Sequence, residues 1–115
     1  MSASKNTMPI VSIITPLYNS APFVLDTINS VLAQTFTEWE WIIIDDCSTD
    51  NSVDLVEEVA CQDSRIKLIK LAHKAGPAVA RNKGIEVARG RYITFLAACV
   101  RILPKQARFR ISMSN

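Results

Sequence analysis

The chain has 115 residues, 49% of them apolar, which suits one small domain with a buried core. No apolar run reaches the roughly 18 residues of a membrane span, and residues 1–9 lack the apolar centre of a signal peptide. The net charge of +2 is uneven, because all 11 acidic residues precede residue 87, while residues 87–115 hold 6 basic ones. We interpret this basic end as a solvated tail and expect no nucleic-acid partner.

The predicted elements alternate between strands and helices along the chain. Proline residues bound the first apolar run, Val and Ile at helical spacing mark the first helix, and a run of three isoleucines ends the second strand. Asp50 or Ser52 is a candidate cap for the second helix. The strands are predicted at residues 10–15, 38–44, 65–71 and 91–98, and the helices at residues 22–35, 54–60 and 77–88.

The order β-α-β-α-β-α-β predicts an α/β fold, with a parallel sheet and helices on both faces. Strands 10–15 and 38–44 are apolar on both faces, so we expect them to be adjacent and buried. In this architecture, ligands bind at the carboxyl ends of the strands. Two strand ends carry polar side chains, Tyr18 and Asn19 after the first strand and Asp45 and Asp46 after the second. We expect Tyr18 and Asp46 to line one cleft.

Two classes of nucleotide-related domain fit these residues poorly. A dinucleotide-binding domain needs a glycine-rich first turn, but "TPLYNSA" has no glycine, and no Walker motif is present. A phospho-receiver domain carries its acidic pair after the first strand and an aspartate after the third. Here the pair follows the second strand, and the third runs into "LAHKAG".

Three linked segments resemble family 2 glycosyltransferases with the GT-A fold. They are "VSIITPLYNSAPFVLDTINSVLAQTF", "WIIIDDCSTDNS" and "AGPAVARNKGIEVARGRYITFL", and together they cover about residues 10–96. The resemblance implies the Rossmann-like, nucleotide-binding half of that fold. It also implies transfer of a sugar from a nucleoside-diphosphate sugar, expected to be UDP-linked, to an acceptor hydroxyl in cell-surface glycan synthesis.

The resemblance also implies roles for individual residues. Asp46 matches the aspartate that accepts a hydrogen bond from the base, for which a uracil N3–H is a suitable donor. Asp45 lies closer to the strand and is expected to hold the loop, while the ring of Tyr18 would flank the base. Arg81 matches the segment near the diphosphate and sugar, where an arginine pairs with phosphate oxygens. The nucleotide-binding candidates are Pro16, Tyr18, Asn19, Asp45, Asp46, Arg81 and Asn82.

The chain departs from the family at the end of the fourth strand. Family members carry aspartates there that hold Mg²⁺ or Mn²⁺, but this chain reads "FLAAC", with Ala97 and Cys99 at the matching positions. Alanine has no ligand atom and a thiol is a poor ligand for hard cations, so we expect no bound metal.

The second, acceptor-binding half that family members carry is not in the sequence. We therefore expect an incomplete and inactive chain: a frameshifted or truncated gene, a deliberately shortened protein, or a degenerate paralogue. The alternative function is that of a non-catalytic nucleotide-binding or partner-binding remnant. The expected organisation is a loose start over 1–9, a nucleotide-sugar-binding half-domain over 10–98 and an atypical basic tail over 99–115. The sparse, odd set of cysteines (Cys47, Cys61 and Cys99) favours the reducing cytoplasm. The family role adds a glycan acceptor and a peripheral position at the inner membrane.

Overall fold

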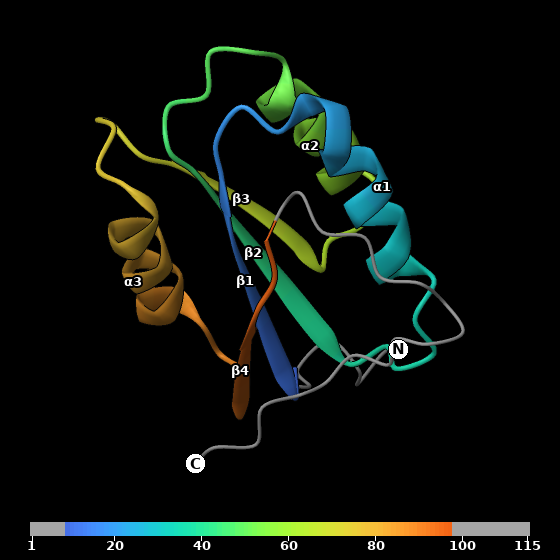
Figure 1. The fold of residues 1–115 in the computed structure, drawn as a ribbon. Helices are drawn as coiled ribbons and strands as arrows, with labels where there is room; N and C mark the ends of the chain where they lie inside the picture. Colours follow the sequence, from blue (N-terminus) through green and yellow to red (C-terminus); the bar gives the residue numbers. More distant parts are fainter. Residues whose placement is uncertain (1–8, 98–115) are drawn as a thin grey trace.

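The computed structural model of the protein describes residues 9–97 and contains the predicted elements in the predicted order (Figure 1). The strands are β1 (Val11–Leu17), β2 (Trp39–Asp45), β3 (Ile66–Lys70) and β4 (Tyr92–Phe95). The helices are α1 (Ala21–Leu32), α2 (Ser52–Ala60) and α3 (Pro77–Val87).

The strands form one parallel sheet in the order β3-β2-β1-β4. Helices α1 and α2 cover one face and α3 covers the other (Figure 1). β1 and β2 pair along their whole length, from Val11 opposite Trp39 to Leu17 opposite Asp45, and all but one of their residues are buried. The predicted adjacency and burial of these two strands are therefore confirmed.

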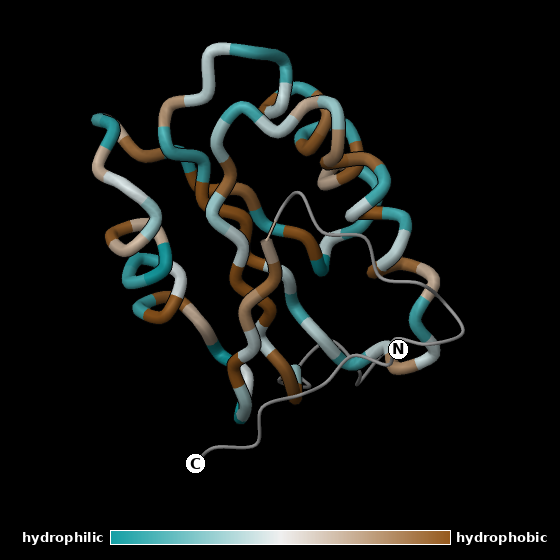
Figure 2. The backbone as a smooth tube through the Cα atoms, in the orientation of Figure 1, coloured by the Kyte–Doolittle hydropathy of each residue, from teal (hydrophilic) through white to brown (hydrophobic). Residues whose placement is uncertain are grey.

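Alternation along β1 and β2 divides the core into two layers. Successive side chains of a strand point to opposite faces, so the odd-numbered residues Ile13, Trp41 and Ile43 pack under α1 and α2. The even-numbered Ile14, Ile42 and Ile44 pack under α3. The strands are accordingly among the most hydrophobic parts of the backbone in Figure 2.

Helix α3 approaches the sheet closely at Gly84 but buries little of itself. Among its residues only Ala80 and Gly84 are fully buried. A Cβ atom at Gly84 would lie 2.6 Å from Ile14 Cγ2 and 2.9 Å from Ile44 Cδ1, closer than such atoms approach in folded proteins. The glycine therefore sets the distance between helix and sheet.

A buried carboxylate holds the chain at the end of α3. Glu40 of β2 accepts hydrogen bonds from Ser12 Oγ, from the backbone N–H of Arg89 (2.6 Å) and from Lys67 Nζ (3.0 Å). Ser12 Oγ in turn accepts the N–H of Gly90. These contacts define the Glu40 cluster, which lies toward the amino ends of the strands.

Some predicted boundaries need correction. β1 continues through Pro16, which was expected to end it. The carbonyl oxygen of Ile14 faces β4 and accepts the N–H of Leu96. Pro16, two residues later, faces the same side, but β4 has already ended there. The N–H that proline lacks is therefore not needed for strand pairing. α1 ends at Leu32 and not at residue 35, because the Gln34 N–H donates to Val31 O and closes the last turn. The Leu32 side chain is exposed.

The last strand also ends earlier than expected, at Phe95 instead of residue 98. Residues 1–8 and 98–115 lie outside the described residues, and nearly all of the expected loose start and all of the expected basic tail, with Cys99, fall on them. None of the helices within residues 9–97 is long and apolar enough to cross a membrane.

Candidate functional site

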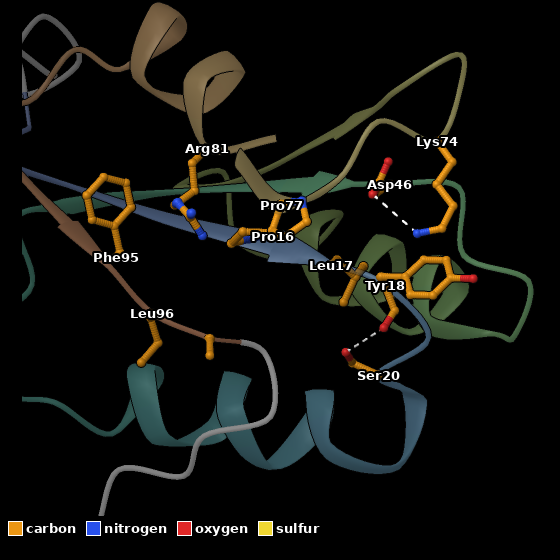
Figure 3. A pocket seen from close by; sticks show the side chains of 11 residues that line it. Pro16, Leu17, Tyr18, Ser20, Asp46, Lys74, Pro77, Arg81, Phe95 and Leu96 are labelled. Carbon is orange, nitrogen blue, oxygen red and sulfur yellow. Dashed lines mark hydrogen bonds and ion pairs between the residues drawn. The ribbon is translucent and has the colours of Figure 1, made fainter. Parts of the chain in front are cut away.

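A pocket of about 460 Å³ opens at the carboxyl ends of β1 and β4 (Figure 3). From β1 the chain proceeds to β2 on one side, while β4 lies on the other, so the strand order reverses between β1 and β4. Open α/β sheets bind ligands at such a switch point. The lining residues are Pro16, Leu17, Tyr18, Ser20, Asp46, Lys74, Pro77, Arg81, Phe95, Leu96 and Ala97.

The turn after β1 supplies the aromatic wall of the pocket. Tyr18 follows the strand directly and remains 42% exposed at the edge of the pocket. Ser20 fixes the turn, because its Oγ donates to Tyr18 O (3.1 Å) and its N–H donates to Ser52 Oγ (2.8 Å). The sequence motif thus places an aromatic face on a turn that neighbouring hydrogen bonds hold.

Asp46 is the buried carboxylate of the pocket. Its N–H donates to Leu17 O (2.8 Å), which continues the pairing of β2 with β1 by one residue. Its two carboxylate oxygens accept the N–H groups of Ala75 (2.8 Å) and Gly76 (2.9 Å), which precede α3. Gly76 has φ of 97°, a left-handed conformation that favours glycine. The predicted cleft shared by Tyr18 and Asp46 is confirmed, since both residues line the pocket.

Two cations also line the pocket. Arg81 extends from α3 on the side of Phe95, opposite Tyr18 (Figure 3). Lys74 lies on the Tyr18 side, with its Nζ 3.8 Å from Asp46 Oδ2 and 3.8 Å from the centre of the Tyr18 ring. We did not predict Lys74 from the sequence, because a lysine in a polar loop is usually solvated and nothing in "LAHKAG" sets this one apart.

Three predicted residues are not among those that line the pocket. Asn19 has a left-handed φ of 47°, and its side-chain oxygen accepts the N–H groups of Thr49 (2.7 Å) and Asp50 (3.2 Å). It therefore joins the loop after β1 to the loop after β2. Asp45 accepts the Ser48 N–H (3.2 Å), which agrees with its expected loop role, and its other oxygen is buried without a hydrogen-bond partner among the described residues. Asn82 is exposed on α3.

Asp50 joins the beginnings of α1 and α2. Its carboxylate accepts the N–H of Ala21 (3.1 Å) and both the N–H (3.0 Å) and the hydroxyl (2.6 Å) of Ser52. The hydrogen bond from the Ser52 hydroxyl is the main cause of the lowered pKa of Asp50. The prediction that Asp50 or Ser52 caps α2 is wrong, because the residue at the cap position is Asn51 and Ser52 is the first residue of the helix. Asp50, one residue before the cap, nevertheless holds the first turn through its hydrogen bonds with Ser52.

The donor set of the pocket does not fit a divalent cation. Leu96 and Ala97, at the end of β4, have no ligand atoms in their side chains, and the lining residues include a single carboxylate, Asp46, whose oxygens already accept two backbone N–H groups. Within residues 9–97 no three His, Cys, Asp or Glu side chains gather as a metal site. Mg²⁺ and Mn²⁺ prefer several oxygen ligands. Cys99, the other expected position, lies outside the described residues.

The sequence model of the family described as Glycosyl transferase family 2 matches residues 12–104. The chain belongs to this family. Among the relatives of this family 2 member is TuaG of Bacillus subtilis, whose name assigns it to teichuronic acid biosynthesis, with 48% identity over 79% of this chain and 36% of that protein. Another is the Escherichia coli UDP-Glc:alpha-D-GlcNAc-diphosphoundecaprenol beta-1,3-glucosyltransferase WfaP, with 44% identity over 77% of this chain and 35% of the relative. The chain spans about a third of the length of these curated relatives.

Solved structures confirm the α/β fold of this family 2 member. S. aureus TarS 1-349 in complex with UDP matches with a TM-score of 0.76 and 31% identity, over 81% of this chain and 28% of that 1-349 chain. The mannosyltransferase PcManGT of Pyrobaculum calidifontis, solved with GDP-Man and Mn²⁺, matches with a TM-score of 0.76 and 24% identity, over 84% of this chain and 29% of that one. At that identity the second match supports the fold alone.

Proposed function

We propose that the pocket between β1 and β4 binds a nucleoside-diphosphate sugar, expected to be UDP-linked. One observation carries the proposal: an aromatic ring, a buried carboxylate and an arginine from three separate segments line one pocket at the switch point of the sheet. The family supports a sugar-nucleotide ligand, and the names of two matched proteins, TarS with UDP and WfaP with UDP-Glc, favour uridine.

In this proposal each side chain meets one part of the nucleotide. The Tyr18 ring stacks on or flanks the base, and the Asp46 carboxylate, which has about four lone-pair sites, accepts the base N–H beside its two backbone bonds. Arg81, across the pocket, pairs with the diphosphate. Asn19 and Asp45 support the loops around the base, Pro16 lines the pocket, and Asn82 stays a predicted contact on the sugar side.

The proposed parent activity is transfer of the sugar to an acceptor hydroxyl in cell-surface glycan synthesis. In that reaction the bond from the anomeric carbon to the diphosphate breaks, a bond to the acceptor oxygen forms, and the acceptor proton passes to a base. Residues 9–97 supply neither a suitable cation site nor an unengaged carboxylate in the pocket for the last step. We therefore propose that this chain holds nucleotide without transferring sugar, which also makes a non-catalytic nucleotide-binding role the second candidate.

A titration with UDP, followed by NMR of the backbone amides, tests the proposal. We expect saturable shifts confined to residues 17–18, 46, 74–76 and 78–81, since Pro16 and Pro77 have no amide N–H. No shifts, or shifts centred on the Glu40 cluster at the other end of the sheet, would contradict nucleotide binding in this pocket. A second assay incubates the chain with UDP-sugars and candidate acceptors and measures UDP release. Sustained turnover would show that the chain is a complete transferase and that the proposed inactivity is wrong.

A further inference from the structure

The Lys74 side chain occupies the space that a base would need. Its ammonium lies 3.8 Å from the centre of the Tyr18 ring and 3.8 Å from Asp46 Oδ2 (Figure 3). A base that both stacks on Tyr18 and donates to Asp46 must lie between these same two groups. The ammonium and the base therefore exclude each other as long as the base takes this position.

The backbone of Lys74 is held, while its side chain is free to move. The next two residues, Ala75 and Gly76, donate their N–H groups to Asp46, which fixes where the lysine stem begins. The side chain itself is 55% exposed and its contacts are an ion pair and a cation–π contact. Four flexible methylene groups allow the ammonium to leave Tyr18 without any change in the backbone.

We propose that Lys74 is a movable cover that competes with the base for the face of Tyr18. This inference rests on the proposed nucleotide-binding function and adds a residue that sets specificity. When the cover opens, its ammonium remains beside the pocket, where it meets the diphosphate of a ligand that has one. A free nucleoside must also displace the lysine, but it has no phosphate for the ammonium to pair with. The cover therefore favours nucleoside diphosphates over nucleosides.

The expected effect follows from the strength of the contacts. A cation–π contact at an exposed site contributes about 0.5–1 kcal/mol. The ion pair adds little, because the exposed ammonium lies 3.8 Å from a buried carboxylate that already accepts two backbone N–H groups. Removing the ammonium should therefore tighten uridine binding by about two- to fivefold. UDP should gain less or lose affinity, because its phosphates lose a cationic partner, so the ratio of UDP to uridine affinity should fall.

The experiment compares uridine and UDP titrations of the wild-type chain with those of three variants. Lys74→Met keeps the stem without the charge, and Lys74→Arg keeps a cation that stacks on aromatic rings, so it should behave as wild type. Lys83→Met removes a lysine of α3 that pairs with Glu86 and is not a lining residue of the pocket, and it should change neither affinity. In the absence of ligand, the Tyr18 ring signals should shift in Lys74→Met and not in Lys83→Met.

Unchanged or weaker uridine binding by Lys74→Met overturns the proposal that Lys74 covers Tyr18. If UDP still binds the wild-type chain and shifts the amides of the pocket, the proposed nucleotide site stands and only the role of Lys74 is wrong. If neither UDP nor uridine binds any variant, the nucleotide site and the cover are overturned together. Unchanged Tyr18 signals in Lys74→Met overturn the cover independently of any ligand.

Discussion

Two buried carboxylates beside α3 differ in whether a ligand can still reach them. Glu40 and Asp46 are each 2% exposed, and each accepts backbone N–H groups from the chain next to the helix, Asp46 before it and Glu40 after it. Glu40 is surrounded by its own partners, whereas Asp46 lines a pocket and has one loose cation at 3.8 Å. Burial of a carboxylate therefore does not mark a site by itself; burial beside an open cavity does.

Both carboxylates compensate for a weakness of α3. The helix buries Ala80 and Gly84 alone, too little apolar surface to hold it firmly by the hydrophobic effect. Charge-assisted hydrogen bonds at its two ends supply the missing anchorage. We interpret the Glu40 cluster as purely structural and Asp46 as structural and ligand-binding, a distinction that substitutions at each residue can test.

The largest expected effect is the loss of stability on removing Glu40. Glu40→Ala removes the acceptor of the buried Ser12 hydroxyl and of the part-buried Arg89 N–H, so the free energy of unfolding should fall by about 2–4 kcal/mol. Urea denaturation measures it, with the exposed Glu38→Ala as control. A loss below about 1 kcal/mol would show that the cluster does not anchor α3.

Asp46→Ala should reduce UDP affinity by about 1.5–3 kcal/mol, the range for a hydrogen bond to a charged group, or about 10- to 150-fold. Calorimetric titration measures the affinity, and the exposed Asp54→Ala on α2 is the matched control. Unchanged affinity in a folded Asp46→Ala chain would reduce Asp46 to a second structural carboxylate and remove the contrast with Glu40.

Gly84→Ala tests the part of α3 that lies between the two carboxylates. The added methyl group meets Ile14 and Ile44, whose β-branched side chains move little, so we expect a loss of about 1–3 kcal/mol. The half-exposed neighbour Lys83→Ala should change stability by less than about 0.5 kcal/mol. A stabilised Gly84→Ala chain would mean that the higher helix propensity of alanine outweighs the contact.

The pH dependence of stability should report Glu40 in particular. Burial raises the pKa of Glu40, but hydrogen bonds from Ser12 and Arg89 and the charge of Lys67 outweigh it, so the pKa lies below its ordinary value of 4.5. A lowered folded-state pKa stabilises the fold above the unfolded-state value, and this contribution is lost as the pH falls from 4.5 through the folded-state pKa. Urea denaturation of Glu40→Gln should show a shallower loss over this range; an identical slope would contradict it.

The smallest expected effect is that of Mn²⁺ on UDP binding. Leu96 and Ala97 have no side-chain ligand atoms, so millimolar Mn²⁺ should change UDP affinity by less than about twofold. The same titration with Mg²⁺ serves as a comparison. A large gain in affinity with either ion would show that residues outside 9–97 complete a metal site.

The sequence predicts the layers of this fold well because its strongest pattern, the runs of apolar residues, is also the main physical reason why the layers form. The run Ile42–Ile44 is apolar on both faces, which only a central strand covered on both sides accommodates. Tyr18 and Asp46 could be placed in one cleft because parallel strands end at a common edge. The ends of the elements are harder to predict. Pro16 can belong to β1 only because the neighbouring strand β4 ends before it reaches Pro16.

The remaining site features depend on contacts that no local pattern encodes. Asn19 was predicted to bind ligand, yet its left-handed backbone directs its side chain to the neighbouring loop, and a polar turn residue fits both roles. The proposed role of Lys74 depends on its contact with the ring of Tyr18, which is 56 positions away along the chain. Glu40 alternates with two tryptophans in "EWEW", which does not reveal that it is buried.

The position of β1 between β2 and β4 has a consequence for the newly made chain on the ribosome. Among the four strands of residues 9–97, β1 is synthesised first and its second neighbour, β4, last, and the Gly90 N–H that binds Ser12 Oγ is 78 residues away. At translation rates of about 5–20 residues per second, one edge of β1 waits roughly 4–16 s for its partner. During that interval an apolar strand with an open edge is a target for chaperones and for pairing between nascent chains.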